Sequence, residues 1–186
     1  MKTGKIDMAL IIVFLTGLAY ASAYAYELSY QKYYQLPTVF IDLNATTLTS
    51  SLLLVAMIAM MVFIISTFVT SLFIKPSDSF FENIPMPVFL VGSVFILLFA
   101  LFIGDTIASQ KEKYMVLKQK EELFVVVLAY KDNLVIAPLD IKRDTIKPKF
   151  QTIEMKDAKD TEVINFEHGI KVDKARSSKE LKKEMK

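Results

Sequence analysis

The side chains that could take part in chemistry are few and lie far apart in the sequence. The single histidine, His168, precedes Gly169 between two expected strands and fits an exposed turn. A cluster of hydroxyl groups within one apolar run comprises Ser66, Thr67, Thr70 and Ser71. A serine nucleophile needs a neighbouring base, and that run contains no ionisable residue. These hydroxyls therefore fit bonds within or between helices, or the lining of a pore.

The composition excludes several classes of site. The 186 residues include no cysteine and only five glycines, which excludes disulfides, iron–sulfur clusters and thiolate zinc sites. No phosphate-binding or dinucleotide-binding fingerprint occurs. The lysines of the C-terminal part alternate with acids, whereas nucleic-acid binding needs a face of one sign. The sequence therefore predicts no enzyme activity, no cofactor, no metal and no nucleic-acid partner.

Three long stretches without charged residues dominate the first 104 positions. They hold 19, 32 and 22 residues, between Asp7 and Glu27, Asp42 and Lys75, and Glu82 and Asp105. A helix of about 20 apolar residues crosses the hydrocarbon core of a bilayer. The sequence therefore predicts a membrane α-helical fold with three transmembrane helices, at residues 8–26, 51–74 and 85–104, in a membrane domain of residues 1–104. Because these stretches lack ionisable groups, they exclude a proton relay and a voltage sensor.

The start of the chain is open to two interpretations. Lys2 and Lys5 precede an apolar run, and alanines follow near residue 25, as in a signal peptide that is cleaved. We favour an uncleaved helix, because tyrosines occupy the cleavage region. The same lysines favour a cytoplasmic N-terminus, which with three spans places the C-terminal part on the extracytoplasmic side of the inner (plasma) membrane. The lysines that follow residue 110 favour the opposite orientation.

The connection after the first stretch is rich in aromatic residues. Their spacing would place several of them on one face of a helix that Pro37 ends. We interpret them as an aromatic belt at the membrane surface, with a ligand or lipid pocket as the less favoured alternative. These interfacial aromatics are Tyr26, Tyr30, Tyr33, Tyr34 and Phe40.

The composition changes at Asp105. Residues 105–186 hold 18 of the 22 basic and 15 of the 20 acidic residues, a net charge of +3. Residues 105–122 are predicted to form a stalk helix, on a thin apolar line of Ile107, Tyr114 and Leu117. Residues 123–172 are predicted to form a small α+β or β-meander module outside the membrane, and residues 173–186 a flexible charged tail.

The expected module begins with a hairpin. Residues 123–130 and 134–137 are β-branched and aromatic, and the turn between them covers residues 131–133. Further strands are expected at residues 150–155, 163–166 and 170–172, with a turn at His168 and Gly169.

The first stretch also contains a ladder of small residues. Gly17, Ala21 and Ala25 recur every four positions, a spacing that lets another helix approach closely. We therefore predict a non-catalytic, multi-pass bacterial membrane subunit that oligomerises through its helices. Its β-rich module would serve sensing, docking or scaffolding. The expected partners are the lipid bilayer and a second copy or another protein that binds residues 105–172.

The alternative is a homo-oligomeric pore, as in holin-like or effector proteins, in which Ser66, Thr67, Thr70 and Ser71 face a water path. The sequence names neither the ligand or partner nor the number of copies.

Overall fold

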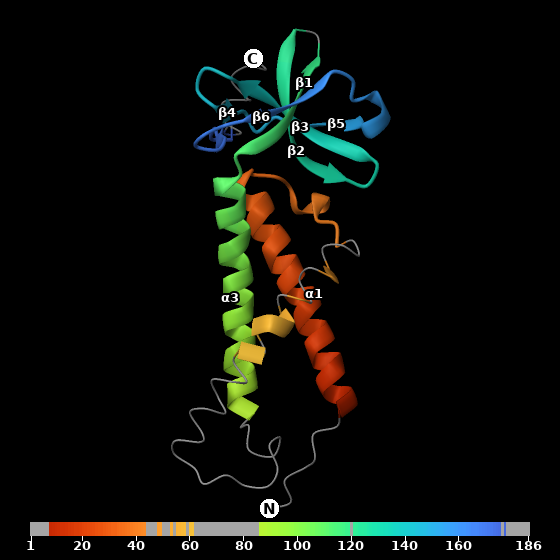
Figure 1. Ribbon diagram of the computed structural model, residues 1–186, viewed down its shortest axis with the longest axis vertical. Coiled ribbons are helices and arrows are strands. Elements are labelled where there is room, and N and C mark those ends of the chain that lie inside the picture. The colour runs from red at the N-terminus through yellow and green to blue at the C-terminus, as the bar shows by residue number, and fades with distance from the viewer. Residues whose placement is uncertain are drawn as a thin grey trace, which may run out of the picture. The chain divides into compact units, whose positions relative to one another are not determined.

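The computed structural model describes residues 8–43, 48–49, 53, 55–58, 60–61, 86–119, 121–175 and 177 (Figure 1). The chain divides into two compact units, and each is described by itself. Unit 1 comprises Met1–Glu27 and Leu43–Ile103, and unit 2 comprises Leu28–Asp42 and Gly104–Lys186. Unit 2 therefore contains the C-terminal ends of two helices as well as the sheet.

Unit 1 is helical in its described residues. It contains most of α1 (Met8–Tyr33) and most of α3 (Met86–Gln110), with further helical residues at 48–49, 53, 55–58 and 60–61. Its core joins Leu18 and Ala19 of α1 to Val55 and to Ile96 of α3. The buried positions of both helices are spaced three or four residues apart, so one narrow face of each helix packs inward.

The prediction of three transmembrane helices is wrong. Among the described residues, one helical segment is long and apolar enough to cross a bilayer, Val91–Gln110 within α3, with a mean hydropathy of 2.2. Residues 8–26 form part of α1, which continues through the polar Glu27, Gln31 and Lys32 to Tyr33. Most of the expected second span, residues 51–74, lies outside the described residues. The fold therefore combines helices with a seven-stranded mixed sheet.

The sheet of unit 2 begins directly after α3. Its strands are β1 (Lys113–Gln119), β2 (Glu122–Tyr130), β3 (Asn133–Asp140), β4 (Thr145–Ile146), β5 (Gln151–Glu154), β6 (Thr161–Asn165) and β7 (Lys171–Val172), with short 3₁₀ turns at Thr38–Phe40 (η1) and Met155–Asp157 (η2). The strand order is β6-β1-β2-β3-β4-β7, and β5 pairs with β3. All pairs are antiparallel except β4 with β7.

The structure confirms the predicted hairpin of β2 and β3, which pair from Phe124 with Pro138 to Tyr130 with Asn133. Strands β5, β6 and β7 also lie where the sequence predicts strands. The stalk helix is shorter than expected, because α3 ends at Gln110 and residues 113–119 form β1. Tyr114 and Val116 are buried while Met115 between them is exposed, so the period of two, and not a helical period, describes this segment.

The two faces of the sheet belong to two separate hydrophobic clusters. One face joins the larger core, in which Tyr114, Val125 and Val135 lie against Tyr34 from the end of α1 and Ala108 from the end of α3. The other face carries a smaller core of Leu117, Phe124, Leu134 and Ile136. The end of α1 therefore belongs to the same hydrophobic core as the sheet.

The turn before β7 approaches the end of α3 closely. Gly169 has φ +67°, and a Cβ atom added there would lie 2.9 Å from the carbonyl oxygen of Ser109 and 3.1 Å from that of Lys111. Only glycine combines this backbone conformation with so close a contact. Gly17 of α1, by contrast, has no atom within 4 Å of an added Cβ.

We expect Gly169→Ala to lower the free energy of unfolding by about 1–3 kcal/mol, through strain and the displacement of the α3 end. Gly17→Ala, the matched control, should leave it unchanged or raise it by up to about 1 kcal/mol, because alanine favours a helix. Thermal unfolding of the full-length chain in detergent, followed by circular dichroism, measures both. Equal melting temperatures for the two variants would contradict the close approach.

Candidate interaction site

The C-terminal end of α1 is fixed by a left-handed cap. The Gln35 N–H donates to the Lys32 carbonyl and the Leu36 N–H to the Gln31 carbonyl, each at 3.0 Å, while Gln35 has φ +58°. This is the Schellman arrangement, in which a residue in the left-handed region satisfies the last carbonyls of a helix. The cap turns the Gln35 side chain toward the segment that follows β7.

Gln35 then binds that segment with both ends of its amide group. Its Nε2 donates to the Asp173 carbonyl at 3.0 Å, and its Oε1 accepts the Ala175 N–H at 3.0 Å. The Gln35 amide thus donates one hydrogen bond to the backbone and accepts another from it, as a residue of a neighbouring β-strand would. Residues 173–175, expected in a flexible tail, are thereby tied to the end of α1.

Tyr34 is the central residue of the site. Its side chain is 0% exposed, its hydroxyl donates to the Ala108 carbonyl at 3.1 Å, and the Tyr114 hydroxyl lies 2.8 Å away. One arrangement satisfies both phenols: Tyr34 donates to Ala108 and accepts from Tyr114. Tyr34 therefore links α1, α3 and β1 in a single hydrogen-bonded chain.

The neighbouring rings enclose this chain. The Tyr33 ring meets the Tyr34 ring edge to face at 5.0 Å between centroids, and the Tyr30 ring lies at 5.3 Å. The Tyr33 hydroxyl donates to the Ile170 carbonyl at 3.0 Å. We call Tyr30, Tyr33, Tyr34, Lys111 and Tyr114 the tyrosine junction. It fixes the helix ends of unit 2 to the sheet and to the chain after Gly169.

Lys111 gives the junction its charge. Its Nζ lies 4.7 Å from the centroid of the Tyr114 ring and donates to the Tyr30 hydroxyl at 3.3 Å. No carboxylate contributes to the shift of the Lys111 pKa, which burial alone causes. Burial lowers the pKa of Lys111, because desolvation disfavours the ammonium form.

The two buried phenols shift in the other direction. Burial raises the pKa of Tyr34, and the nearby Tyr30 adds to the effect. Burial likewise raises the pKa of Tyr114, against a smaller opposing effect of the hydrogen bond with Tyr34. Both side chains stay neutral in the folded chain at physiological pH.

Gln31 is a polar side chain that the fold leaves without partners. It is buried, and neither its Nε2 nor its Oε1 has a hydrogen-bond partner within the described structure. It lies one turn before Tyr34 on α1. An unpaired buried amide lowers the free energy of unfolding by about 1–3 kcal/mol. Gln31 therefore destabilises the folded end of α1.

The structure distributes the expected site residues over different environments. Tyr30, Tyr33 and Tyr34 meet in the tyrosine junction, and Phe40 stacks edge to face on Tyr130 of β2 at 5.7 Å. Tyr26 is half-buried in unit 1. The belt of aromatics at a membrane surface stays a prediction.

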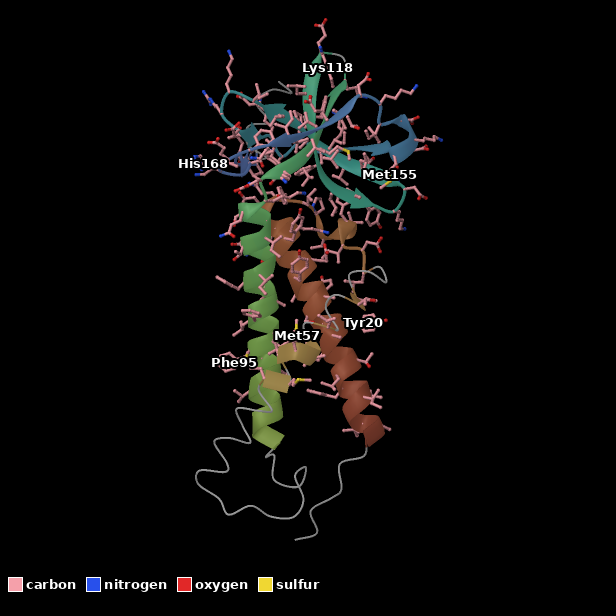
Figure 2. All side chains as sticks on the ribbon, in the orientation of Figure 1. Tyr20, Met57, Phe95, Lys118, Met155 and His168 are labelled. Carbon is pink, nitrogen blue, oxygen red and sulfur yellow. The ribbon has the colours of Figure 1, made fainter. Side chains whose placement is uncertain are left out.

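Other expected residues take no part in the junction. Gly17 and Ala21 are exposed and Ala25 is half-buried, so their role in helix association stays a prediction. His168 is exposed in the turn before Gly169 (Figure 2). The hydroxyl cluster of Ser66, Thr67, Thr70 and Ser71 lies outside the described residues, and the pore prediction with it.

Sequence reasoning missed the roles of Gln35, Lys111 and Tyr114. Tyr114 was expected on a helix, and the short apolar run of residues 114–117 fits a strand as well as a helix. Gln35 and Lys111 carry no such signal, because their partners lie up to 140 positions away.

The described residues form no recognisable catalytic or metal-binding site. No group of three or more potential metal ligands occurs among them. Two open grooves of about 400 and 420 Å³ lie on the sheet. Both are lined by side chains of both charges, and neither contains a histidine, a serine or an unpaired nucleophile with a base.

Fold and site together define a β-sheet module fixed to the ends of two helices. Residues 1–164 match the family model described as TfpB, type IV pilus biogenesis protein TfpB. The chain therefore belongs to the TfpB family, a pilus biogenesis family, which fits a bacterial protein that interacts with other proteins. No curated protein and no solved structure matches the chain.

We expect Tyr34→Phe to lower the free energy of unfolding by about 1–3 kcal/mol, because the Tyr114 hydroxyl and the Ala108 carbonyl lose a partner in a buried site. Tyr24→Phe, which changes an exposed tyrosine of α1, is the matched control and should have no measurable effect. Chemical denaturation of the full-length chain in detergent measures both. A Tyr34→Phe chain as stable as the parent would contradict the hydrogen-bonded chain.

The stability of unit 2 should fall at alkaline pH. Unfolded tyrosines ionise near pH 10, whereas the raised pKa values of Tyr34 and Tyr114 keep them protonated in the folded chain. Their contribution is thus complete below about pH 10 and is lost as the pH rises further. Lys111 has the opposite effect. Because its pKa is lowered in the folded chain, the free energy of unfolding rises with pH between this lowered pKa and the ordinary lysine pKa.

Above pH 10, the unfolding free energy of Tyr34→Phe should therefore fall less steeply than that of the parent chain, by up to about 1.4 kcal/mol per pH unit. Denaturation curves between pH 8 and about 11.5 measure the two slopes. Parallel curves would show that Tyr34 is not protected from ionisation.

Proposed function

We propose that this chain is a non-catalytic, membrane-anchored subunit of type IV pilus biogenesis whose unit 2 docks on other proteins. The observation that carries the proposal is the Tyr34 hydroxyl between Ala108 and Tyr114. Through it, a folded sheet is built directly on the end of an apolar helix. Such a construction presents a folded surface on an anchored chain, which is what a docking subunit requires.

Membership of the TfpB family supports the process and the need for protein partners. The grooves of the sheet are open and carry both charges, a character that suits transient contacts between proteins.

The anchor is α3. Its segment Val91–Gln110 is long enough to span a bilayer, and it exposes the large apolar side chains of Val94, Phe95, Leu98, Phe99 and Phe102. Figure 2 shows Phe95 projecting from this helix. So many exposed apolar side chains on one helix indicate contact with lipid. We place α3 in the inner membrane with unit 2 on the extracytoplasmic side.

Single-cysteine labelling tests this orientation without background, because the chain contains no cysteine. We expect Lys142→Cys, in the exposed turn after β3, to react with a membrane-impermeant maleimide in intact spheroplasts. Met155→Cys, exposed in the 3₁₀ turn η2, should react equally. Labelling of both positions only after permeabilisation would show that unit 2 lies on the cytoplasmic side. Recovery of the chain in the soluble fraction would show that α3 does not anchor it in the membrane.

Pilus assembly tests the function. In a strain that lacks this gene, we expect the parent chain and the Tyr24→Phe control to restore surface pili. Tyr34→Ala, which removes the centre of the junction, should restore few or none, and Tyr34→Phe an intermediate number. Immunoblots of the membrane fraction give the amount of each chain. Normal piliation with Tyr34→Ala at parental levels would refute the role of the junction.

A further inference from the structure

Among the residues that the structure describes, strand β6 forms one end of the sheet and pairs on one side only, with β1. Phe166, just beyond β6, donates its N–H to the Glu112 carbonyl at 2.8 Å, which fixes the phase of the ladder. In an antiparallel ladder, alternate residues bond to the neighbour, so Glu162 and Ile164 face β1. The backbone groups of Thr161, Val163 and Asn165 point away from the sheet, and no partner for them occurs among the described residues.

The middle of β6 also exposes an apolar side chain. Val163 is 65% exposed and Met115, its partner on β1, is 40% exposed. The row continues inward through Val126, half-buried on β2, to Ile136, buried on β3. An apolar row that becomes more exposed toward a free edge leaves hydrophobic surface uncovered where backbone groups are also unpaired.

Natural sheets protect their free edges with lysine, proline, bulges or short strands. Strand β6, Thr-Glu-Val-Ile-Asn, has five residues and contains no lysine, proline or bulge, and its one charged side chain is Glu162. The strands at the other free edges are shorter, since β5 has four residues and β7 two. Among the described strands, β6 is thus the edge best suited to pair with another strand.

We propose that β6 docks antiparallel on the β6 strand of a second copy of this chain, so that the two sheets become continuous. The proposal builds on the proposed function, because it identifies a surface by which unit 2 associates. It assigns the uncovered edge to one occupant of stated sequence and register.

The sequence of β6 is complementary to itself about Val163. With Val163 on the two-fold axis, Thr161 lies opposite Asn165 of the second copy and Glu162 opposite Ile164. The outward backbone groups of Thr161, Val163 and Asn165 then form the bonded pairs that an antiparallel ladder requires. The two Val163 and two Met115 side chains complete one apolar row across both sheets.

The charges are compatible with this register. The two Glu162 carboxylates are diagonal neighbours and not directly opposite, so their repulsion is small. A register moved by one residue would instead turn the apolar Val163 away from its counterpart. The register with Val163 on the axis is therefore the one that brings the two Val163 side chains together on one face.

The area involved is small, because only five residues on each side pair. Stable interfaces in solution bury more, about 1,200–2,000 Å² in total. Anchoring in one membrane raises the effective concentration of the two strands. The contact is therefore reversible, and it forms where the chains are concentrated, which suits regulated assembly.

Disulfide trapping in native membranes tests the register. Two differently tagged full-length chains are expressed together, one Glu162→Cys and the other Ile164→Cys, and the membranes are oxidised. Opposite residues at an unbonded position lie about 4.5 Å apart between Cα atoms, within the range of a disulfide. Glu162→Cys with itself and Ile164→Cys with itself are the matched controls, since these pairs lie about 8 Å apart, beyond that range.

We expect the mixed pair to give at least about five-fold more disulfide dimer than either control pair. Adding Val163→Lys to both chains should reduce that dimer to the level of the controls, because it places two positive charges on the axis. This exposed substitution leaves the pairing with β1 intact, and protein levels in the membrane verify that the chain folds.

Equal trapping in the mixed and control pairs would overturn the proposal, as would trapping that Val163→Lys leaves unchanged. A disulfide from either cysteine to a different protein, in place of the second copy, would also overturn it. The proposed function is judged separately by membrane fractionation and piliation. If the chain stays anchored and supports pili but the mixed pair gives no excess of disulfide dimer, only the pairing of β6 is refuted.

Discussion

The hydrogen-bonded chain from Tyr114 through Tyr34 to the Ala108 carbonyl is the interaction on which the rest of unit 2 depends. Apolar packing alone would hold a helix end against a sheet in several orientations, because it has no direction. Two phenols and a carbonyl in a dry core permit one orientation, since any other leaves a polar group unpaired. The cap at Gln35 and its two bonds to residues 173–175 extend that constraint to the end of the described chain.

Features with a local cause could be predicted from the sequence. The hairpin of β2 and β3 follows from two β-branched runs and a polar turn, and the turn at Gly169 from glycine itself. The apolar run before Asp105 predicted a helix, which became α3. Residues 113–119 were predicted as part of a stalk helix because Ile107, Tyr114 and Leu117 fit a helical spacing, whereas they form β1. Paired with β2 and β6, residues 113–119 gain ladder bonds on both sides, which outweigh the helical alternative.

The tyrosines show why the site could not be predicted in the same way. An aromatic belt and an aromatic core have the same composition, and Tyr30, Tyr33 and Tyr34 were assigned to the first. What distinguishes them is the partner, and the partners of Tyr33 and Tyr34 are 137 and 74–80 positions away. Gln35 is a stronger case, because no local rule predicts an amide in the left-handed region that binds Asp173 and Ala175.

These separations have a consequence for biosynthesis. At about 5–20 residues per second, a ribosome needs on the order of ten seconds to travel from Tyr33 to Ile170. During that interval the Tyr33 hydroxyl lacks its partner, although Ala108 and Tyr114, the partners of Tyr34, are made earlier. Closure of unit 2 therefore requires that translation has passed Ile170.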